Sequence, residues 1–316
     1  MKFRTLGNSG LQVSLAGLGT NNFGRRLDQE GTTAVVNAAL DEGINFFDTA
    51  TSYGDGLSEE YIGKALGARR HDVVIASKFG WPGEAAEHVV GGSRRYIFQA
   101  IDDSLRRLNT DYIDLYQFHK PDPATPLEET LEAMSDLVRA GKVRYLGTSN
   151  FSGWQISDAE WTSASRHLTR CVSAQNQWSL LNRSAEPEVV PACEHHGIGM
   201  LPFFPLASGF LTGKYQRDVT PPENTRLANW GAEYAGSIAN DANWDTLEAL
   251  TAFAAQHGHT VLELALSWLA SQPVVSSVIA GATRPDQVSG NVAATQAWEL
   301  SAAELNEVDG LLQAKS

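Results

Sequence analysis

Short apolar runs alternate with amphipathic helical patterns along most of this chain. A short apolar run bounded by turn residues is typical of a buried strand, and helical periodicity after it indicates a crossover helix. Because eight such units follow one another, we expect an α/β fold whose parallel sheet closes into a barrel rather than remaining open. The expected strands are 15–20, 44–48, 73–78, 112–119, 143–149, 171–176, 198–204 and 275–281.

The remaining segments lie before the first strand and between the last two. The turn residues 7–10 separate apolar runs at 3–6 and 11–13, which predicts a hairpin ahead of the barrel. Roughly 70 residues separate the last two strands, and loops of such length are usually functional or disordered. The later part of that gap predicts helices near 245–257 and 261–271. No linker interrupts the pattern, so we expect one domain over 1–316.

The composition excludes several classes of function. The chain has 316 residues, 42% of them hydrophobic, and a formal net charge of −13. A chain this acidic lacks the basic footprint of a nucleic-acid-binding protein and is repelled by anionic membranes. No run approaches the ~18 apolar residues of a membrane-spanning helix, and the N-terminus lacks the apolar core of a signal peptide. We therefore expect a globular, cytoplasmic protein.

Two other site types have little support in the sequence. Cys171 and Cys193 are not in a CxxC spacing and no HExxH motif occurs, so we expect no metal site, and a metal-dependent hydrolase would lack ligands. Gly17 and Gly19 begin like a dinucleotide-binding fingerprint. However, Asn22 stands where the third glycine belongs, and no helical pattern begins there.

Polar side chains end three successive expected strands. Asp48, Lys78 and His119 occupy these ends, and each faces the same side as the residues two and four positions before it. Each residue alone has an ordinary structural explanation, such as a solvated lysine or a hydrogen-bonded histidine. Parallel strands, however, end at one edge of the sheet, where α/β enzymes place their chemistry. With Tyr53 in the glycine-bounded loop after Asp48, these residues indicate a candidate active site.

At these positions the sequence resembles the aldo-keto reductase family, nearest to the branch that contains the potassium-channel β subunits and many bacterial reductases. The Asp, Tyr, Lys and His tetrad of the family matches Asp48, Tyr53, Lys78 and His119. The resemblance covers essentially the whole chain. It implies a (β/α)8 TIM barrel with an N-terminal β-hairpin across one end and long loops at the C-terminal face. It also implies that NADPH, exchanging with NADP+, is the hydride donor.

The tetrad residues have complementary chemistry. Reduction of an aldehyde or ketone requires a proton for oxygen as well as a hydride for carbon. Tyr53 would be the general acid, and the Lys78 ammonium is expected to lower the pKa of its phenol. Asp48 would hold Lys78 in place and keep it charged. His119 would donate a hydrogen bond to the substrate oxygen.

The resemblance also implies where the cofactor binds. Ser149, Asn150 and Gln175 match residues that hold the carboxamide, and amide side chains suit that group. Phe203 occupies the position of the aromatic residue that stacks on the nicotinamide in the family, where many members have tyrosine. Arg284 is expected to clamp the 2′-phosphate and to set the preference for NADPH. The full expected set is Gly19, Thr20, Asn21, Asp48, Ser149, Asn150, Gln175, Phe203, Phe204, Pro205, Leu206, Ala207, Gly209, Lys214, Arg226, Gly281, Thr283, Arg284, Gln287 and Asn291.

Two functions are compatible with these residues. One is NADPH-dependent reduction of a small-molecule carbonyl compound; the other is an NADP(H)-binding regulatory or redox-sensing subunit with slow catalysis. His119 favours the enzyme, since the channel subunits carry asparagine at that position. Tyr53, Trp81 and His119 are expected to contact the substrate. Trp178, Asn21 and Asn22 are also expected at the mouth of the substrate site. The sequence does not name the substrate, and a homo-oligomer is compatible with it but not derivable.

Overall fold

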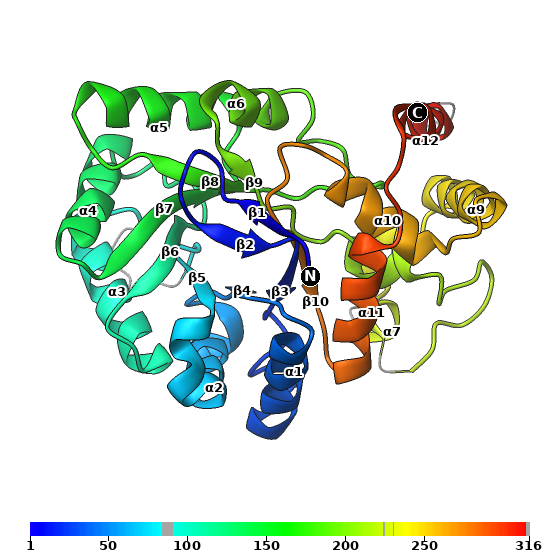
Figure 1. Ribbon diagram of the computed structural model, residues 1–316, viewed down its shortest axis with the longest axis horizontal. Coiled ribbons are helices and arrows are strands. Elements are labelled where there is room, and N and C mark those ends of the chain that lie inside the picture. Colours follow the sequence, from blue (N-terminus) through cyan, green and yellow to red (C-terminus); the bar gives the residue numbers. More distant parts are fainter. Residues whose placement is uncertain (84–90, 224, 230, 314–316) are drawn as a thin grey trace.

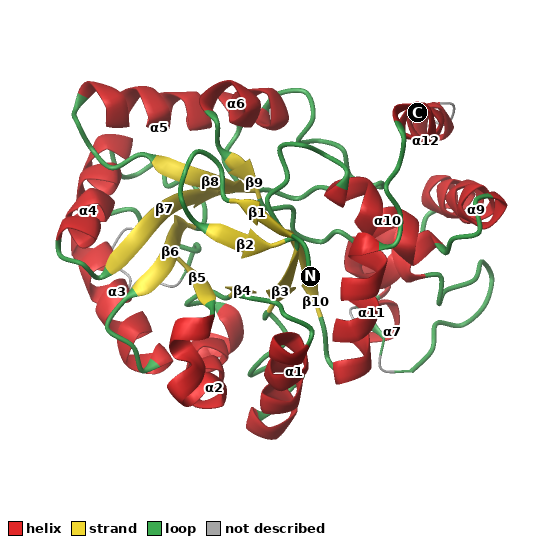
Figure 2. Ribbon diagram, viewed as in Figure 1, coloured by secondary structure: helices red, strands yellow, loops and turns green. Residues whose placement is uncertain are grey.

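Eight parallel strands occupy the centre of the molecule and helices surround them (Figure 1 and Figure 2). The computed structural model describes residues 1–83, 91–223, 225–229 and 231–313. Within these ranges the two hairpin strands and the first barrel strand follow one another directly. From the first barrel strand on, at least one helix lies between each strand and the next. The expected (β/α)8 barrel is therefore confirmed.

The strands are β1 (Phe3–Thr5), β2 (Gln12–Ser14), β3 (Ala16–Gly19), β4 (Phe46–Asp48), β5 (Val74–Phe79), β6 (Ile113–Phe118), β7 (Val143–Ser149), β8 (Cys171–Gln175), β9 (Gly199–Met200) and β10 (Val278–Gly281). The α-helices are α1 (Gln29–Asp41), α2 (Leu57–Leu66), α3 (Arg94–Leu108), α4 (Leu127–Arg139), α5 (Gly153–Ser165), α6 (Val189–His196), α7 (Arg226–Asn229), α8 (Ala232–Ile238), α9 (Asp241–Gln256), α10 (Val261–Ala270), α11 (Pro285–Gln296) and α12 (Ala302–Gln313). Short 3-10 segments are η1 (Tyr53–Gly56), η2 (Gly67–Asp72) and η3 (Ala207–Thr212).

The barrel strands pair in the order β10-β3-β4-β5-β6-β7-β8-β9, and every neighbouring pair is parallel. The ring closes between its first and last members through a parallel bridge from Met200 to Val275. Backbone hydrogen bonds support this closure: the Ser276 N–H donates to the Met200 carbonyl at 2.9 Å, and the Ile279 N–H to the Pro202 carbonyl at 3.2 Å. The carboxyl ends of all eight strands thus meet at one face.

One expected strand is much shorter than its apolar run. The run 198–204 forms a ladder only at Gly199–Met200. Pro202 and Pro205 offer no N–H to a ladder, and Phe204 turns the chain with φ +53°. Beyond Met200 the run keeps only isolated contacts with its neighbours, such as the parallel bridge from Phe203 to Gln177. It then enters the long segment that leads to α9, within which η3, α7 and α8 form.

The hairpin β1–β2 lies across the amino-terminal end of the barrel (Figure 2). Its buried side chains Leu6 and Val13 join an apolar cluster with interior residues such as Phe46, Leu115 and Ile279. The Arg4 guanidinium donates to the carbonyls of the segment before β10, at 2.6 to 3.1 Å. This end of the barrel is therefore closed by apolar packing, and access is from the opposite face.

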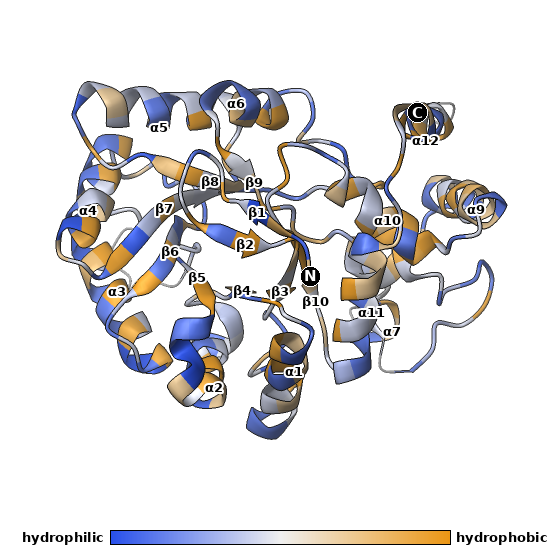
Figure 3. Cartoon of the chain, in the orientation of Figure 1, coloured by the Kyte–Doolittle hydropathy of each residue, from blue (hydrophilic) through white to orange (hydrophobic). Residues whose placement is uncertain are grey.

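Helices α9 and α10 confirm the two helices expected after the long segment. Helix α10 is apolar on most of its surface (Figure 3). It can therefore bury eight of its ten residues between the barrel and the outer helices. Its N-terminus is fixed by a capping box, in which Thr260 and Glu263 satisfy each other's backbone N–H groups. This packing holds the segment before β10 against the barrel.

Candidate active site

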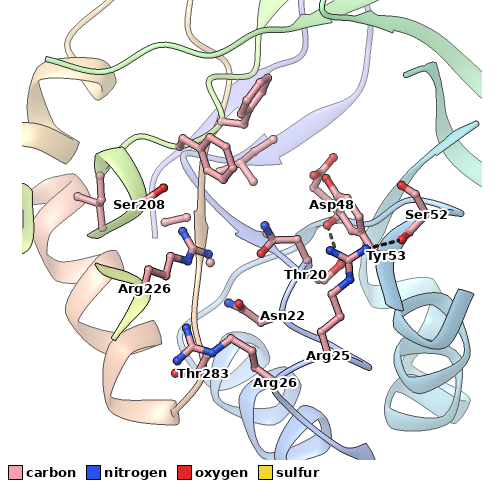
Figure 4. Close-up of a pocket in the computed structure, with 18 of the residues that line it drawn as sticks. Thr20, Asn22, Arg25, Arg26, Asp48, Ser52, Tyr53, Ser208, Arg226 and Thr283 are labelled. Atoms are coloured by element: carbon pink, nitrogen blue, oxygen red, sulfur yellow. Dashed lines mark hydrogen bonds between the residues drawn. The ribbon is translucent and has the colours of Figure 1, made fainter. Parts of the chain in front are cut away.

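A cavity of about 1420 Å³ opens at the carboxyl ends of the strands. Its lining combines residues from the ends of β3, β4, β7, β8 and β10 with loop residues of 203–226, and Figure 4 shows part of it. Asp48, Tyr53 and His119 line this cavity, whereas Lys78 lies just beneath it with no exposed surface. The four tetrad positions, which are spread from position 48 to position 119 of the sequence, are thus brought to one place.

The Lys78 ammonium is the centre of the tetrad. Its Nζ donates to Asp48 Oδ2 at 2.8 Å, to the Thr49 carbonyl at 2.8 Å and to the Tyr53 hydroxyl oxygen at 3.3 Å. The other carboxylate oxygen of Asp48 accepts from the side-chain amide of Gln175 at 2.7 Å. All three donor sites of the ammonium are therefore used, and its position relative to the phenol is fixed.

The electrostatic surroundings decide which tetrad groups carry a proton. Burial by itself lowers the pKa of Lys78, but Asp48 and Tyr53 outweigh it and raise that pKa above its ordinary value. Burial raises the pKa of Tyr53, and the opposing attraction of Lys78 does not cancel this. Lys78 therefore lowers the pKa of the phenol as expected, but burial outweighs it and the net shift of that pKa is upward. Tyr53 holds its proton beside a lysine that stays charged.

His119 presents a neutral imidazole to the cavity. Burial, together with the nearby Lys78 charge, lowers the pKa of His119 to about 2. Its Nδ1 is buried and has no hydrogen-bond partner among the described residues. The ring lies between Tyr53, at a centroid distance of 6.1 Å, and Trp81, at 4.7 Å. A neutral ring so placed can donate one hydrogen bond to a substrate oxygen but adds no charge.

The loop that carries Tyr53 is held tightly against the loop after β3. Gly54 has φ +58°, and a Cβ there would lie 2.8 Å from the Phe23 carbonyl oxygen, so only glycine fits. Below it, Ser58 Oγ lies 2.9 Å from both Thr20 Oγ1 and Thr49 Oγ1. The phenol position is therefore set by backbone packing and a buried hydroxyl network as well as by Lys78.

Three polar residues at the ends of β7 and β8 form one wall of the cavity. Ser149 Oγ donates to the Gln175 carbonyl at 2.9 Å, and the Asn150 amide nitrogen donates to the His119 carbonyl at 2.9 Å. The side-chain oxygens of Asn150 and Gln175 accept no hydrogen bond from the described residues. This wall therefore offers acceptors to a ligand that carries an amide NH₂ group, as the expected carboxamide site requires.

The segment 203–209 contains an unusual run of left-handed backbone. Phe204, Ala207 and Ser208 have φ of 53°, 44° and 60°, although none is glycine. Such conformations carry strain and gather at ligand-binding sites. Of the expected residues of this segment, Ala207 does not line the cavity and Ser208 takes its place. Lys214 Nζ lies over Gly209, 3.0 Å from where a Cβ would be, so a side chain there would displace the lysine.

The far end of the cavity is rich in arginine. Arg284 follows β10 as expected, but it is exposed and makes a two-pronged ion pair with Asp286, both contacts being 3.0 Å. Arg26 follows β3 and Arg226 begins α7, and both line the cavity; Figure 4 shows the Arg26 side chain beside Thr283. Burial and the charge of Arg26 lower the pKa of Arg226. An anion bound in this part of the cavity would offset the repulsion between the two positive charges.

A family model described as the aldo/keto reductase family matches residues 16–313. The chain belongs to the aldo/keto reductase family. It is 37% identical to a probable voltage-gated potassium channel subunit beta of Arabidopsis thaliana, over 100% of this chain and 98% of that protein. It is 34% identical to an L-glyceraldehyde 3-phosphate reductase of Escherichia coli O157:H7, over 98% and 92%, respectively. An uncharacterized oxidoreductase of Bacillus subtilis is 35% identical, over 94% and 91%.

Not every expected site residue of this aldo/keto reductase lies in the cavity. Trp178 is wrong as a substrate contact: it is buried, it stacks edge-on against Trp268 at 5.6 Å, and its indole N–H donates to Glu186 at 2.9 Å. Trp81 and Asn22 do line the cavity. A tryptophan shortly after a strand end can turn inward or outward, and the sequence does not distinguish the two.

Sequence reasoning missed Arg25, Arg26 and Ser208, which line the cavity of the aldo/keto reductase. The signal for the arginines was present, because two adjacent basic residues follow the first strand in a strongly acidic chain. No described helix is long and apolar enough to cross a membrane. Within the same ranges no group of three or more His, Cys, Asp or Glu side chains is placed to hold a metal ion.

Proposed function

We propose that this protein is an NADPH-dependent oxidoreductase that reduces aldehydes or ketones to alcohols, with Tyr53 as the general acid. The observation that carries the proposal is the 3.3 Å hydrogen bond from the Lys78 ammonium to the Tyr53 hydroxyl, at the floor of a cavity that also receives His119. A phenol that is protonated at neutral pH and touches a fixed cation is suited to protonate a carbonyl oxygen.

The cavity fits the proposed cofactor in the chemistry of its donors and acceptors. Asn150 and Gln175 line the cavity, and their side-chain oxygens accept no hydrogen bond from the described residues, which suits a carboxamide. At the other end, Arg226, Lys214 and Arg284 supply cations to a protein of net charge −13, which suits phosphate groups. When bound, a reduced nicotinamide would supply the hydride that the carbonyl carbon receives.

The residues of the chain would then divide the remaining work. His119, as a neutral donor, orients the carbonyl oxygen toward the Tyr53 hydroxyl. Tyr53 transfers its proton to that oxygen, and the phenolate left behind is stabilised by the Lys78 ammonium at 3.3 Å. Asp48 keeps Lys78 charged through the step, since burial alone would favour the neutral amine. In the reverse direction, Tyr53 would accept the proton of an alcohol.

A second candidate function is an NADP(H)-binding regulatory subunit in which catalysis is slow. The relatives named as potassium channel subunits support it. The presence of His119 at the cavity favours the enzyme instead. The two differ in turnover number, because a regulatory subunit would bind NADPH tightly yet oxidise it slowly with every carbonyl compound.

The test measures NADPH oxidation with a panel of aldehydes and ketones that includes glyceraldehyde 3-phosphate, since one relative is named for that substrate. Tyr53→Phe should leave the Kd of NADPH, measured by fluorescence, unchanged and lower kcat by several orders of magnitude. Retained turnover in Tyr53→Phe would mean that another group supplies the proton. Turnover by the wild-type protein slower than cofactor exchange, with every carbonyl compound, would favour the regulatory subunit.

A further inference from the structure

One cationic side chain in the cavity lies beside the tetrad rather than at the far, arginine-rich end. Arg25 follows β3, and its Nη2 donates to the carbonyl of Ser52 at 3.2 Å. Ser52 directly precedes Tyr53, so the guanidinium lies next to the residue proposed as the acid. Figure 4 shows the Arg25 side chain directed toward Ser52 and Tyr53, away from Arg226 and Thr283.

The charge of Arg25 has no carboxylate partner among the described residues, and its one resolved effect within the protein is the smallest of the contributions that lower the pKa of Tyr53. A guanidinium has five N–H donors, and the bond to Ser52 occupies one of them. Arg25 forms no ion pair with any carboxylate in the part of the chain that the structure describes, whereas Arg70, Arg107 and Arg183 each have at least one. It is exposed and lines the same cavity as Tyr53 and Trp81. An arginine that keeps open donors there can bind an anionic group of the molecule that Tyr53 protonates.

The loop that carries Arg25 is rigid where it matters for this role. Gly24 packs so closely that a Cβ there would lie 2.4 Å from Cβ of Leu57, the first residue of α2. The Gly24 N–H and the Leu27 carbonyl close the loop at 2.9 Å. The backbone positions of Arg25 and Tyr53 are therefore held relative to each other by packing, and the reach of the arginine side chain from this fixed point limits the length of ligand that can span the two groups.

We propose that Arg25 is a specificity-determining residue that selects short carbonyl compounds carrying an anionic group, phosphate or carboxylate, a few atoms from the carbonyl. This inference rests on the proposed reductase function and names its substrate class. Trp81 lies next to the His119 ring and has 42% of its surface exposed, so it would cover the carbon chain between the carbonyl and the anionic group of such a substrate.

The experiment compares matched pairs of substrates that differ only in the charged group: glyceraldehyde 3-phosphate with glyceraldehyde, and succinic semialdehyde with butanal. The wild-type protein should prefer the charged member of at least one pair. In Arg25→Gln, the KM of that member should rise about tenfold or more, as expected for loss of a charge-assisted bond. The kcat and KM for the neutral member should stay within about twofold, and Arg25→Lys should restore part of the loss.

Arg139→Gln is the matched control. It removes the same charge from the exposed side of α4, where Arg139 pairs with Asp136 outside the cavity. It should leave both members of each pair unchanged. If Arg25 served only to hold the Tyr53 loop through Ser52, Arg25→Gln would lower kcat equally for charged and neutral members, and the inference would be wrong.

A binding measurement separates this inference from the proposed function. Glycerol 3-phosphate and glycerol are titrated calorimetrically into the wild-type protein in the presence of NADP+. Tighter binding of glycerol 3-phosphate, lost in Arg25→Gln and kept in Arg139→Gln, supports the anion site even if no aldehyde is reduced. Equal weak binding of both alcohols, together with no preference within the succinic semialdehyde pair, overturns it, and the reductase function is then judged on the neutral aldehydes alone. A weaker NADP+ affinity in Arg25→Gln with unchanged substrate KM would assign Arg25 to the cofactor and also overturn it.

Discussion

The buried pair of Asp48 and Lys78 allows the electrostatic argument to be tested by stability alone. Neither side chain has more than 3% of its surface exposed, and Nζ and Oδ2 lie 2.8 Å apart. Asp48→Asn keeps the shape and the acceptor that Gln175 uses, but it leaves the ammonium without its counter-charge. Removing one partner of a buried pair costs about 3–5 kcal/mol in the free energy of unfolding. Adding Lys78→Met removes the stranded charge, but it also removes the donor of the Thr49 carbonyl, which offsets part of the gain. The double variant should therefore be about 1–3 kcal/mol more stable than Asp48→Asn.

The contribution of Lys78 to stability should change with pH in opposite directions in the wild-type protein and in Asp48→Asn. In the wild-type protein the pKa of Lys78 is raised, so its contribution to stability is present below the unfolded pKa of about 10.4 and is lost as pH rises through the folded pKa. In Asp48→Asn the desolvation that lowers the Lys78 pKa is left without its main opponent. The folded state then binds fewer protons than the unfolded state, and this variant gains stability as pH rises toward about 10. Its deficit against the double variant should shrink by up to about 1.4 kcal/mol per pH unit.

Urea unfolding, followed by circular dichroism and tryptophan fluorescence between about pH 7 and pH 10, measures both quantities. The difference between the two variants cancels other groups that titrate there, such as the buried thiols of Cys171 and Cys193, whose pKa burial raises to about 12. The exposed pair Glu60–Lys64 is the control, and Glu60→Gln should cost less than about 1 kcal/mol. Equal stability of Asp48→Asn and the double variant at every pH would refute the claim that the stranded charge accounts for most of the lost stability.

Two further predictions concern cofactor choice and the Tyr53 loop. Arg284→Ala should raise the KM of NADPH at least about tenfold and hardly change that of NADH. Asp286→Asn, which frees Arg284 from its ion pair, should lower the KM of NADPH. Equal effects of Arg284→Ala on both cofactors would mean that Arg284 does not bind the 2′-phosphate. Gly54→Ala should destabilise the protein by about 1–3 kcal/mol more than Gly67→Ala and lower kcat, because both glycines have positive φ but only Gly54 also lacks room for a Cβ. Thermal unfolding of the two variants checks the comparison, and equal losses would mean that backbone strain alone matters.

The meeting of polar side chains at the strand ends could be predicted from the sequence, because it depends on only two regularities. A period of two places Asp48 and Lys78 on the interior side of their strands, and parallel pairing brings the carboxyl ends together. The register Phe46 to Val74 and Asp48 to Ala76 agrees with this, so an apolar pattern alone positions the pair. The contact to Tyr53 needed more, since it depends on a left-handed turn at Gly54 whose existence the glycine suggested but whose direction it did not fix.

The features that sequence reasoning missed depend on how loops fold. Arg25 and Arg26 are adjacent in sequence, yet one lies beside Tyr53 and the other beside Thr283. Arg284 was placed correctly after β10, but its pairing with Asp286 two residues on is a matter of side-chain geometry. The effect of Lys78 on the pKa of Tyr53 was expected, but the net direction was not, because burial opposes it and is larger, and burial is a property of the folded chain.

That balance has a consequence for the direction of the proposed reaction. Reduction starts from the protonated phenol, the form that burial favours at Tyr53, whereas oxidation of an alcohol starts from the phenolate. Only Lys78 at 3.3 Å supports the phenolate strongly, and its charge depends in turn on Asp48. Weakening the Asp48–Lys78 pair should therefore lower kcat for alcohol oxidation more than kcat for carbonyl reduction at neutral pH, with compensating changes in the KM values because the reaction equilibrium is fixed. The reason is that oxidation needs the phenolate as its starting state, whereas reduction forms it only as the proton leaves.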